Sequence, residues 1–301
     1  KQKTAYEIMP SLVGSEMCIR DRVMSTPIVA VRPTEPIAHA KRMMLRHKID
    51  RLLVMERGKA LGMLSMRDIA ENLSMSAPAW RRHPIDQIPI GRFMRQRLIT
   101  VSPTTALDRV AKLMLKHDIS SLVVSEDGSP VGIVTKTDLV KYFSKAFKDR
   151  FKVAALMTPD PITVNRGHSI ARVVEIMKKY KVARVVVAEG RRPIGIITER
   201  DVGFAQLEVP WKPPVKMVKY TRRLERAGRP QARYVKHVAL LTAEDVMTPN
   251  PLTVEMYDDV ADAAELMLGR GISGLPVTER EQLVGILTKT DLVKGISRLG
   301  S

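Results

Sequence analysis

Four ungapped copies of one pattern run through the 301-residue chain, and this repetition constrains its fold more than any other feature. Each copy begins with a nine-residue opening motif that contains a methionine: VMSTPIVAV at 23–31, FMRQRLITV at 93–101, LMTPDPITV at 156–164 and VMTPNPLTV at 246–254. Each copy ends with a closing motif of the form Gly-x-x-(Thr/Ser)-x-x-Asp, at 62–68, 132–138, 195–201 and 285–291. Such self-similarity is typical of a chain built from one repeated structural unit.

The spacing inside the copies is constant. Met24 of the first opening motif lies 44 residues before Asp68, and the other three copies keep the same 44-residue separation. A further methionine follows the first by 20 residues in every copy, at Met44, Met114, Met177 and Met267. The closing motifs of repeats two and four extend into almost the same sequence, GIVTKTDLVK at 132–141 and GILTKTDLVK at 285–294. All four repeats are therefore expected to fold alike.

Repeat two shows the expected unit. Residues 98–101 favour a strand, and apolar residues at helical spacing from residue 107 predict a helix that ends at His117 and Asp118 and has its methionine in the core. Residues 119–124 and 130–134 favour two strands joined by a hairpin turn at 126–129, and a second helix opens at residues 135–138. A unit of this size is too small to bury a full core alone, so it should dock on a neighbouring copy.

The segments outside the repeats differ in character. We expect motif units at 23–70, 92–145, 154–204 and 243–298, with a basic insert at 205–240. Nine Lys or Arg and one acid, Glu225, lie between residues 212 and 236. Residues 1–22 have no counterpart in the other repeats and resemble the translation of a sequencing-library adapter. They are expected to be non-native, with the true N-terminus missing.

Composition limits the class of protein. No run of about 18 apolar residues is present, so no membrane span is expected. The single Cys18 allows no internal disulfide framework and is typical of a reducing compartment, so we expect a cytoplasmic protein. The formal charge of +18 favours polyanions such as nucleic acid or nucleotide phosphates, or else reflects a solvated basic surface.

The closing motif admits two roles. Its hydroxyl residue stands where a strand passes into a helix, so the hydroxyl and nearby N–H groups can bind phosphate. Its aspartate, three residues on, can accept hydrogen bonds from a vicinal diol such as that of ribose. The same spacing is close to that of a capping box, which stabilises a helix start without any ligand. The two roles are compatible if part of the carboxylate remains exposed.

Together these motifs resemble the cystathionine β-synthase (CBS) domain family. The resemblance covers residues 23 to about 296 and includes the central strands KIDRLLV at 48–54, DISSLVV at 118–124, KVARVVV at 181–187 and GISGLPV at 271–277. It implies an α+β fold of four CBS motifs (β-α-β-β-α). Repeats one and two, and repeats three and four, would form two pseudo-twofold pairs that can stack into a disc.

The resemblance also implies binding residues. In this family the hydroxyl and carboxylate of the closing motif contact the phosphate and ribose of adenosine-containing ligands, and a threonine of the opening strand lies close to adenine. The matching closing-motif residues are Ser65, Asp68, Thr135, Asp138, Thr198, Asp201, Thr288 and Asp291. The matching opening-strand residues are Thr100, Thr163 and Thr253, whereas repeat one has Ala30.

A further position implied by the resemblance precedes the central strand, where basic residues of relatives reach phosphates. It is occupied by Arg51, Ser121, Arg184 and Gly274. Arg51 and Arg184 are therefore candidate phosphate ligands, and the alternative is a surface charge beside a strand. Repeats one and three are expected to take charged nucleotides, and repeats two and four to be empty or to hold a less charged compound.

We therefore expect a regulatory sensor and no enzyme. AMP, ADP, ATP or S-adenosylmethionine would bind between paired motifs and change the contact with a protein partner or with a second copy in a dimer. The six histidines show no metal-ligand spacing, and the four aspartates lack a neighbouring base or nucleophile, so neither a metal nor a catalytic cofactor is expected.

The alternative is a nucleic-acid-binding regulator in which the CBS motifs are scaffold. In that case the basic insert is the working part, with Trp211, Tyr220 and Tyr234 available for stacking on bases. The insert is otherwise a solvated, partly helical linker.

Overall fold

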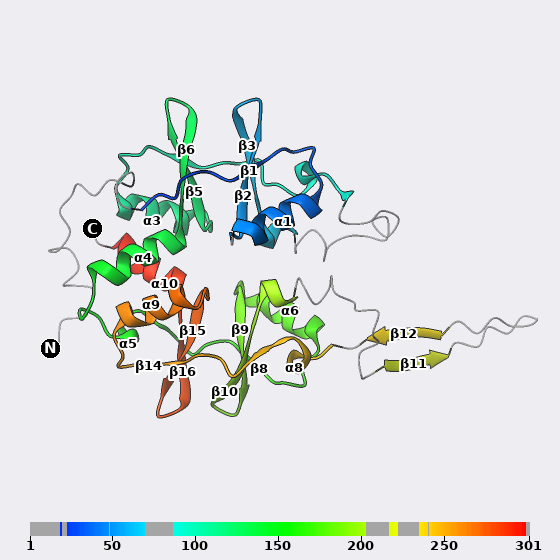
Figure 1. Ribbon diagram of the computed structural model, residues 1–301. Coiled ribbons are helices and arrows are strands. Elements are labelled where there is room, and N and C mark those ends of the chain that lie inside the picture. The colour runs from blue at the N-terminus through cyan, green and yellow to red at the C-terminus, as the bar shows by residue number, and fades with distance from the viewer. Residues whose placement is uncertain are drawn as a thin grey trace, which may run out of the picture. The chain divides into compact units, whose positions relative to one another are not determined.

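The computed structural model describes residues 19, 23–47, 49–69, 87–202, 217–221, 235–239 and 241–298. The chain divides into two compact units, each of which is described by itself. The larger unit comprises Lys1–Pro161 and Leu252–Ser301, and the smaller unit comprises Ile162–Pro251. The larger unit thus holds the bodies of repeats one, two and four, and the smaller unit holds the body of repeat three (Figure 1).

The larger unit contains three sheets that follow one plan. Repeat one contributes β1 (Ala30–Val31), α1 (Ile37–His47), β2 (Arg51–Glu56) and β3 (Lys59–Ser65). Repeat two contributes a 3-10 turn η5 (Ile90–Arg92), β4 (Thr100–Val101), α3 (Leu107–Lys116), β5 (Ser121–Glu126), β6 (Ser129–Thr135) and α4 (Lys136–Ala146). The remaining elements are α5 (Val153–Leu156), β7 (Thr158–Pro159), β14 (Val254–Glu255), α9 (Val260–Gly269), β15 (Gly274–Glu279), β16 (Gln282–Thr288) and α10 (Lys289–Ser297).

The smaller unit repeats this plan once. It contains β8 (Thr163–Val164), α6 (Ile170–Tyr180), β9 (Arg184–Glu189), β10 (Arg192–Thr198), β11 (Met217–Thr221), β12 (Val235–Ala239), α8 (Ala243–Val246) and β13 (Thr248–Pro249). Its main sheet has the order β13-β10-β9-β8. β11 and β12 form a separate antiparallel pair within the insert. The sequence did not predict these two strands, and the rest of the insert, for which a partly helical linker was one expectation, lies outside the described residues.

In every repeat a short opening strand runs parallel to the central strand, which forms an antiparallel hairpin with the return strand. Each hairpin has one register shift near its tip, so the irregularity recurs with the sequence. The turn expected at 126–129 is confirmed. Asp127 and Gly128 there have φ angles of 51° and 78°, as a tight turn with two left-handed residues requires.

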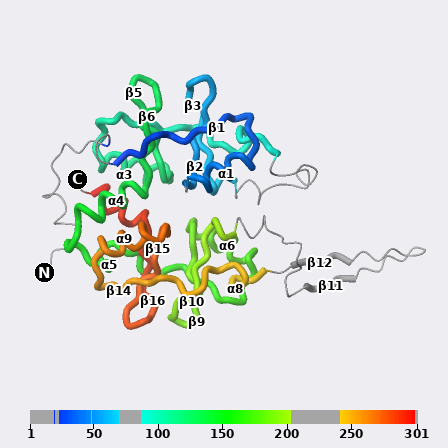
Figure 2. The backbone as a smooth tube through the Cα atoms, viewed as in Figure 1, coloured from blue at the N-terminus to red at the C-terminus, as the bar shows by residue number. Residues whose placement is uncertain are grey.

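The opening segments are exchanged between neighbouring repeats. Within the larger unit, Ser25 of repeat one forms a β-bridge with Ile133 of repeat two, and Arg95 of repeat two forms one with Met63 of repeat one. β7, from the opening of repeat three, pairs with β16 of repeat four in the larger unit. β13, from the opening of repeat four, pairs with β10 of repeat three in the smaller unit. In Figure 2 the blue tube that leads into β1 crosses the hairpin of β5 and β6, in agreement with the bridge between Ser25 and Ile133.

This exchange explains the recurring glycine and the first methionine. A Cβ on Gly132 would lie 2.9 Å from Sδ of Met24, and one on Gly285 would lie 2.6 Å from Sδ of Met157. At Gly62 a Cβ would lie 2.5 Å from the backbone oxygen of Arg95. The closing-motif glycine is therefore needed because the opening segment of a neighbouring repeat packs directly over it.

The second recurring methionine lies in the core, as expected. Met44, Met114 and Met267 are no more than 2% exposed, and Met177 is 6% exposed. Repeat one and the opening of repeat two share one apolar cluster, and repeat three with the opening of repeat four shares another. The opening segments therefore complete the cores of their neighbours.

Repeats two and four additionally pack together through helices α3, α4, α9 and α10 (Figure 1). Their apolar residues form one cluster, in which Phe143 of α4 and Ile296 of α10 are fully buried. Lys136 Nζ donates to Thr290 Oγ1 at 3.1 Å, and Lys289 Nζ donates to Thr137 Oγ1 at 3.0 Å. The near-identical closing segments thus meet reciprocally, a contact that sequence analysis did not predict.

Most elements of repeat two lie where the sequence predicts them, with one correction. The opening strand is shorter than 98–101, because only Thr100 and Val101 pair with β5. The first helix starts at Leu107 as expected, and its cap residue Ala106 makes no side-chain cap bond.

The segment 1–22 lies outside the described residues except for Ile19. That residue is fully buried in the cluster that also contains Val23 and Val153.

Candidate functional site

The closing motif forms the same hydrogen-bonded cap in all four repeats. In repeat two, the backbone N and the hydroxyl of Thr135 donate to Oδ2 of Asp138 at 2.8 and 2.7 Å. The backbone N of Asp138 donates back to Oγ1 of Thr135 at 3.3 Å. Equivalent contacts join Ser65 to Asp68, Thr198 to Asp201 and Thr288 to Asp291. The capping-box role is therefore present, and it uses the Oδ2 atom of each aspartate.

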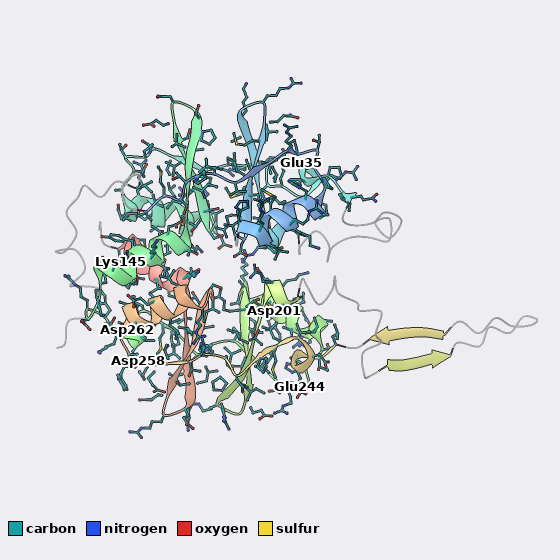
Figure 3. All side chains as sticks on the ribbon, viewed as in Figure 1. Glu35, Lys145, Asp201, Glu244, Asp258 and Asp262 are labelled. Carbon is teal, nitrogen blue, oxygen red and sulfur yellow. The ribbon has the colours of Figure 1, made fainter. Side chains whose placement is uncertain are left out.

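The other carboxylate oxygen, Oδ1, distinguishes the repeats. In repeat one it accepts Nε of Arg95 at 2.5 Å, and in repeat two it accepts the hydroxyl of Ser25 at 3.1 Å. In repeat four it accepts the hydroxyl of Thr158 at 3.1 Å and Nζ of Lys294 at 2.9 Å. In repeat three, no donor among the described residues reaches Oδ1 of Asp201. Figure 3 labels Asp201 in the smaller unit.

Burial divides the aspartates in the same way. Asp68 and Asp291 are each 4% exposed, whereas Asp138 and Asp201 are half-buried. The two covered carboxylates are the two that accept a cation. Repeats two and three therefore present the more accessible carboxylate oxygens.

The residue that follows the opening methionine is a site component that sequence reasoning missed. In three repeats this residue carries a hydroxyl group, and in repeat two it carries a positive charge: Ser25, Thr158 and Thr248 against Arg95. Three of these side chains donate to the aspartate of a neighbouring repeat, as described above. Its recurrence at a fixed place in the opening motif was the available signal, but the exchange that brings it to the carboxylate is a tertiary feature.

The opening-strand threonines lie at the edge of the sheets and are exposed. Thr100 begins β4 and Thr163 begins β8. Thr253 precedes β14, so it lies just outside the strand in which it was expected, because pairing with β15 begins at Val254. Within the described residues no hydrogen bond joins these threonines to the closing motifs, and their adenine-binding role stays a prediction.

Arg51 links repeats one and two. It is half-buried at the start of β2, and its Nη1 donates to the backbone oxygen of Ser120 at 2.6 Å. Burial lowers the pKa of its guanidinium, and the negative charge of Asp50 and Asp68 opposes this shift. Arg184 occupies the equivalent half-buried position at the start of β9. A phosphate-binding role for either arginine stays a prediction.

Neither a metal site nor a membrane-spanning helix is found in the described ranges. Over these residues, no group of three or more His, Cys, Asp or Glu side chains could hold a metal ion. The helices of these ranges include none that is long and apolar enough to cross a membrane.

The CBS domain family model matches residues 19–75, 90–145, 153–207 and 243–298. The chain belongs to the CBS domain family. Each matched range contains one opening motif and one closing motif, so the fourfold repetition is a repetition of CBS domains.

Relatives of this CBS protein are found in archaea. The chain is 28% identical over 286 residues to the uncharacterized protein MJ1404 of Methanocaldococcus jannaschii. The match covers 92% of this chain and 61% of MJ1404, so the chain spans about three fifths of that relative.

Two solved structures resemble this chain over nearly its whole length. One is MJ1225 of Methanocaldococcus jannaschii, proposed to be an archaeal homolog of g-AMPK, with a TM-score of 0.72 and 19% identity. It covers 92% of this chain and 99% of its own. The other is a conserved protein of Pyrococcus horikoshii, with a TM-score of 0.62, 18% identity, and coverage of 93% and 100%. At these identities the likeness shows the fold.

The arrangement in each CBS domain can do two things chemically. The Oδ2 contacts stabilise the start of the following helix, which requires no ligand. An Oδ1 atom that accepts only a neutral hydroxyl, or no described donor, retains lone pairs that can accept a diol.

Proposed function

We propose that this CBS protein is a regulatory sensor that binds adenosine-containing ligands through its closing-motif carboxylates. The observation that carries the proposal is that the two carboxylate oxygens of each aspartate have different hydrogen-bonding roles. Oδ2 completes the helix cap, while Oδ1 of the half-buried Asp138 and Asp201 remains available to ribose hydroxyls. The family membership supports the same class of ligand.

Binding would act on the contacts between repeats. Opening segments cross from one repeat to the next and place Ser25 against Asp138. A ligand that replaces such a hydroxyl donor changes an inter-repeat contact, and the available energy is its differential affinity for the two arrangements. The output would be a protein partner or self-association, because the proposed role is binding and not catalysis.

The direct test is calorimetric titration of the full chain with AMP, ADP, ATP and S-adenosylmethionine. Asp201→Ala should weaken binding at repeat three by about tenfold to a hundredfold, because a charged acceptor is lost. Asp245→Ala is a matched control in the smaller unit. Asp245 Oδ2 accepts the backbone N and hydroxyl of Thr242 at 2.8 and 2.7 Å, the same cap outside any closing motif.

Two outcomes would contradict the proposal. One is the absence of binding by any of the four compounds at millimolar concentration. The other is an equal loss of binding in Asp201→Ala and Asp245→Ala, because this would show that the helix cap and not the ligand contact was measured.

A second candidate function, nucleic-acid binding, is favoured by the distribution of charge. Residues 162–251 carry 18 Lys or Arg and 8 Asp or Glu, so 18 − 8 gives +10 of the chain's total of +18. Exposed Lys178, Lys179 and Lys181 lie around the end of α6, and Tyr180 is 50% exposed. Phosphates are attracted to such concentrated positive charge, and an exposed ring can stack on a base.

This second function predicts a steep fall in affinity for labelled RNA or DNA as salt rises. Lys178→Glu with Lys179→Glu should weaken binding, whereas the exposed Lys141→Glu with Lys145→Glu in the larger unit should not. Equal effects of the two pairs would indicate a non-specific charge effect. Anisotropy titrations at several salt concentrations measure the difference.

A further inference from the structure

The four closing-motif aspartates can be compared with one another. They differ in the residue of an opening segment that lies next to each of them. The residue after the opening methionine is Ser25, Arg95, Thr158 or Thr248. Each lies opposite the residue that follows a closing-motif glycine: the partners are Ile133, Met63, Ile286 and Ile196. The backbone position is therefore the same in all four repeats, and only the side chain changes.

The arginine makes the strongest of these contacts. Arg95 Nε lies 2.5 Å from Oδ1 of Asp68, and this carboxylate side chain is only 5% exposed. Backbone hydrogen bonds between Arg95 and Met63, 2.9 and 3.0 Å long, hold the segment in place. A ribose at Asp68 would have to replace a charged donor by neutral hydroxyls and leave the guanidinium without this partner, which is unfavourable.

Repeat two lacks this obstacle. Oδ1 of Asp138 accepts the exposed hydroxyl of Ser25 at 3.1 Å, a neutral contact that a diol can replace at little cost. In repeat three, Oδ1 of Asp201 has no donor within the described part of the chain. In repeat four, Thr158 and Lys294 both engage the buried Asp291.

We propose that Arg95 excludes ligand from repeat one, by occupying the carboxylate of Asp68 from within the chain. Adenosine-containing ligands then bind at repeats two and three and not at repeat one. This inference rests on the proposed function and adds its stoichiometry. It differs from the nucleotide binding that Arg51 led the sequence analysis to expect at repeat one.

Arg95→Thr tests the inference, because it installs the hydroxyl found in repeats three and four. Calorimetric titration of the full chain with adenosine and with AMP should show one additional site in this variant. Arg97→Thr, which removes an exposed charge two residues away, should bind like the wild type. If Arg95 were a phosphate ligand, Arg95→Thr would instead weaken AMP about tenfold or more at an existing site, and this result would overturn the inference.

The reciprocal variant is Ser25→Arg. It places an arginine against Asp138 in the geometry of repeat one, so binding at repeat two should be lost while repeat three still binds. Retention of both sites in Ser25→Arg would overturn the inference.

The ion pair can also be tested without ligand. A double-mutant cycle of Arg95→Thr and Asp68→Ala, followed by urea unfolding, should give a coupling of about fivefold in the unfolding equilibrium. A coupling near unity would overturn the inference.

The ligand experiments separate this inference from the proposed function. Binding by the wild type without an additional site in Arg95→Thr overturns the inference alone. Absence of binding by both proteins overturns the proposed function together with the inference.

Discussion

Repeats two and four carry closing segments that differ at one position, Val134 against Leu287, yet their aspartates have different surroundings. Asp138 is half-buried, and among the described residues the one donor to its Oδ1 atom is the hydroxyl of Ser25. Asp291 is 4% exposed, and its Oδ1 atom accepts both Thr158 and Lys294. The Oδ2 contacts of the two caps are nearly the same.

The difference shows that the hydrogen-bond donors of the two carboxylate oxygens are determined in different ways. Oδ2 is held by residues within three positions along the chain, so identical sequences produce identical caps. Oδ1 is held by a segment that arrives from another repeat, so its environment depends on packing. Lys141 of repeat two, the counterpart of Lys294, makes no ion pair with Asp138 in the described structure.

The largest expected effect concerns the shared core of repeats two and four. Phe143→Ala should lower the free energy of unfolding by about 3–5 kcal/mol, because a fully buried ring that stacks on Phe147 at 4.8 Å is removed. Urea unfolding measures the loss. Leu45→Ala on α1, where the side chain is 69% exposed, should change stability by less than about 0.5 kcal/mol. Similar losses in both variants would contradict the packing described.

A smaller effect is expected at the closing-motif glycines. A Cβ added to the glycine of repeat four would meet closer contacts than one added to the glycine of repeat two. Gly285→Ala should cost about 1–3 kcal/mol, because its Cβ would lie 2.6 Å from Sδ of Met157 and 3.1 Å from the backbone oxygen of Thr158. Gly132→Ala should cost less, since its nearest contact is 2.9 Å. Thermal unfolding tests this order, and Gly167→Ala, with no atom within 4 Å of its Cβ, serves as control.

The aspartates themselves should differ by a smaller amount. Asp138→Ala should cost about 0.5–2 kcal/mol through loss of the helix cap. Asp291→Ala should cost about 1 kcal/mol more, because the contacts with Thr158 and Lys294 are also lost. Equal unfolding free energies for the two variants would show that the Oδ1 contacts contribute nothing to stability.

The smallest effect is expected for the reciprocal lysine contacts. Lys136→Ala and Lys289→Ala should each lower stability by about 0.5–1 kcal/mol, through loss of one partly exposed hydrogen bond to a threonine of the other repeat. Near-equal values would confirm that the two segments meet symmetrically. A large effect in only one variant would contradict the reciprocal geometry.

Much of the fold could be predicted from the sequence because its determinants are local. Apolar spacing and the turn at Asp127 and Gly128 located the helices and the hairpin of repeat two. The packing of opening segments over the closing-motif glycines could not be predicted, because the spacing of the glycines does not indicate which segment packs against them. The contacts of Arg95 and Ser25 with aspartates 27 and 113 residues away were missed for the same reason.

Sequence by itself determined the repeated unit, its α+β elements and the capping contacts of Asp68, Asp138, Asp201 and Asp291, because each depends on spacing within a few residues. Only the tertiary structure decided what reaches the second oxygen of each carboxylate. That outcome depends on exchanged segments and on the packing of α3, α4, α9 and α10, whose partners are far apart in the chain. Near-identical motifs can therefore carry unequal sites, since the accessibility and charge of a buried carboxylate depend on neighbours that its own motif does not specify.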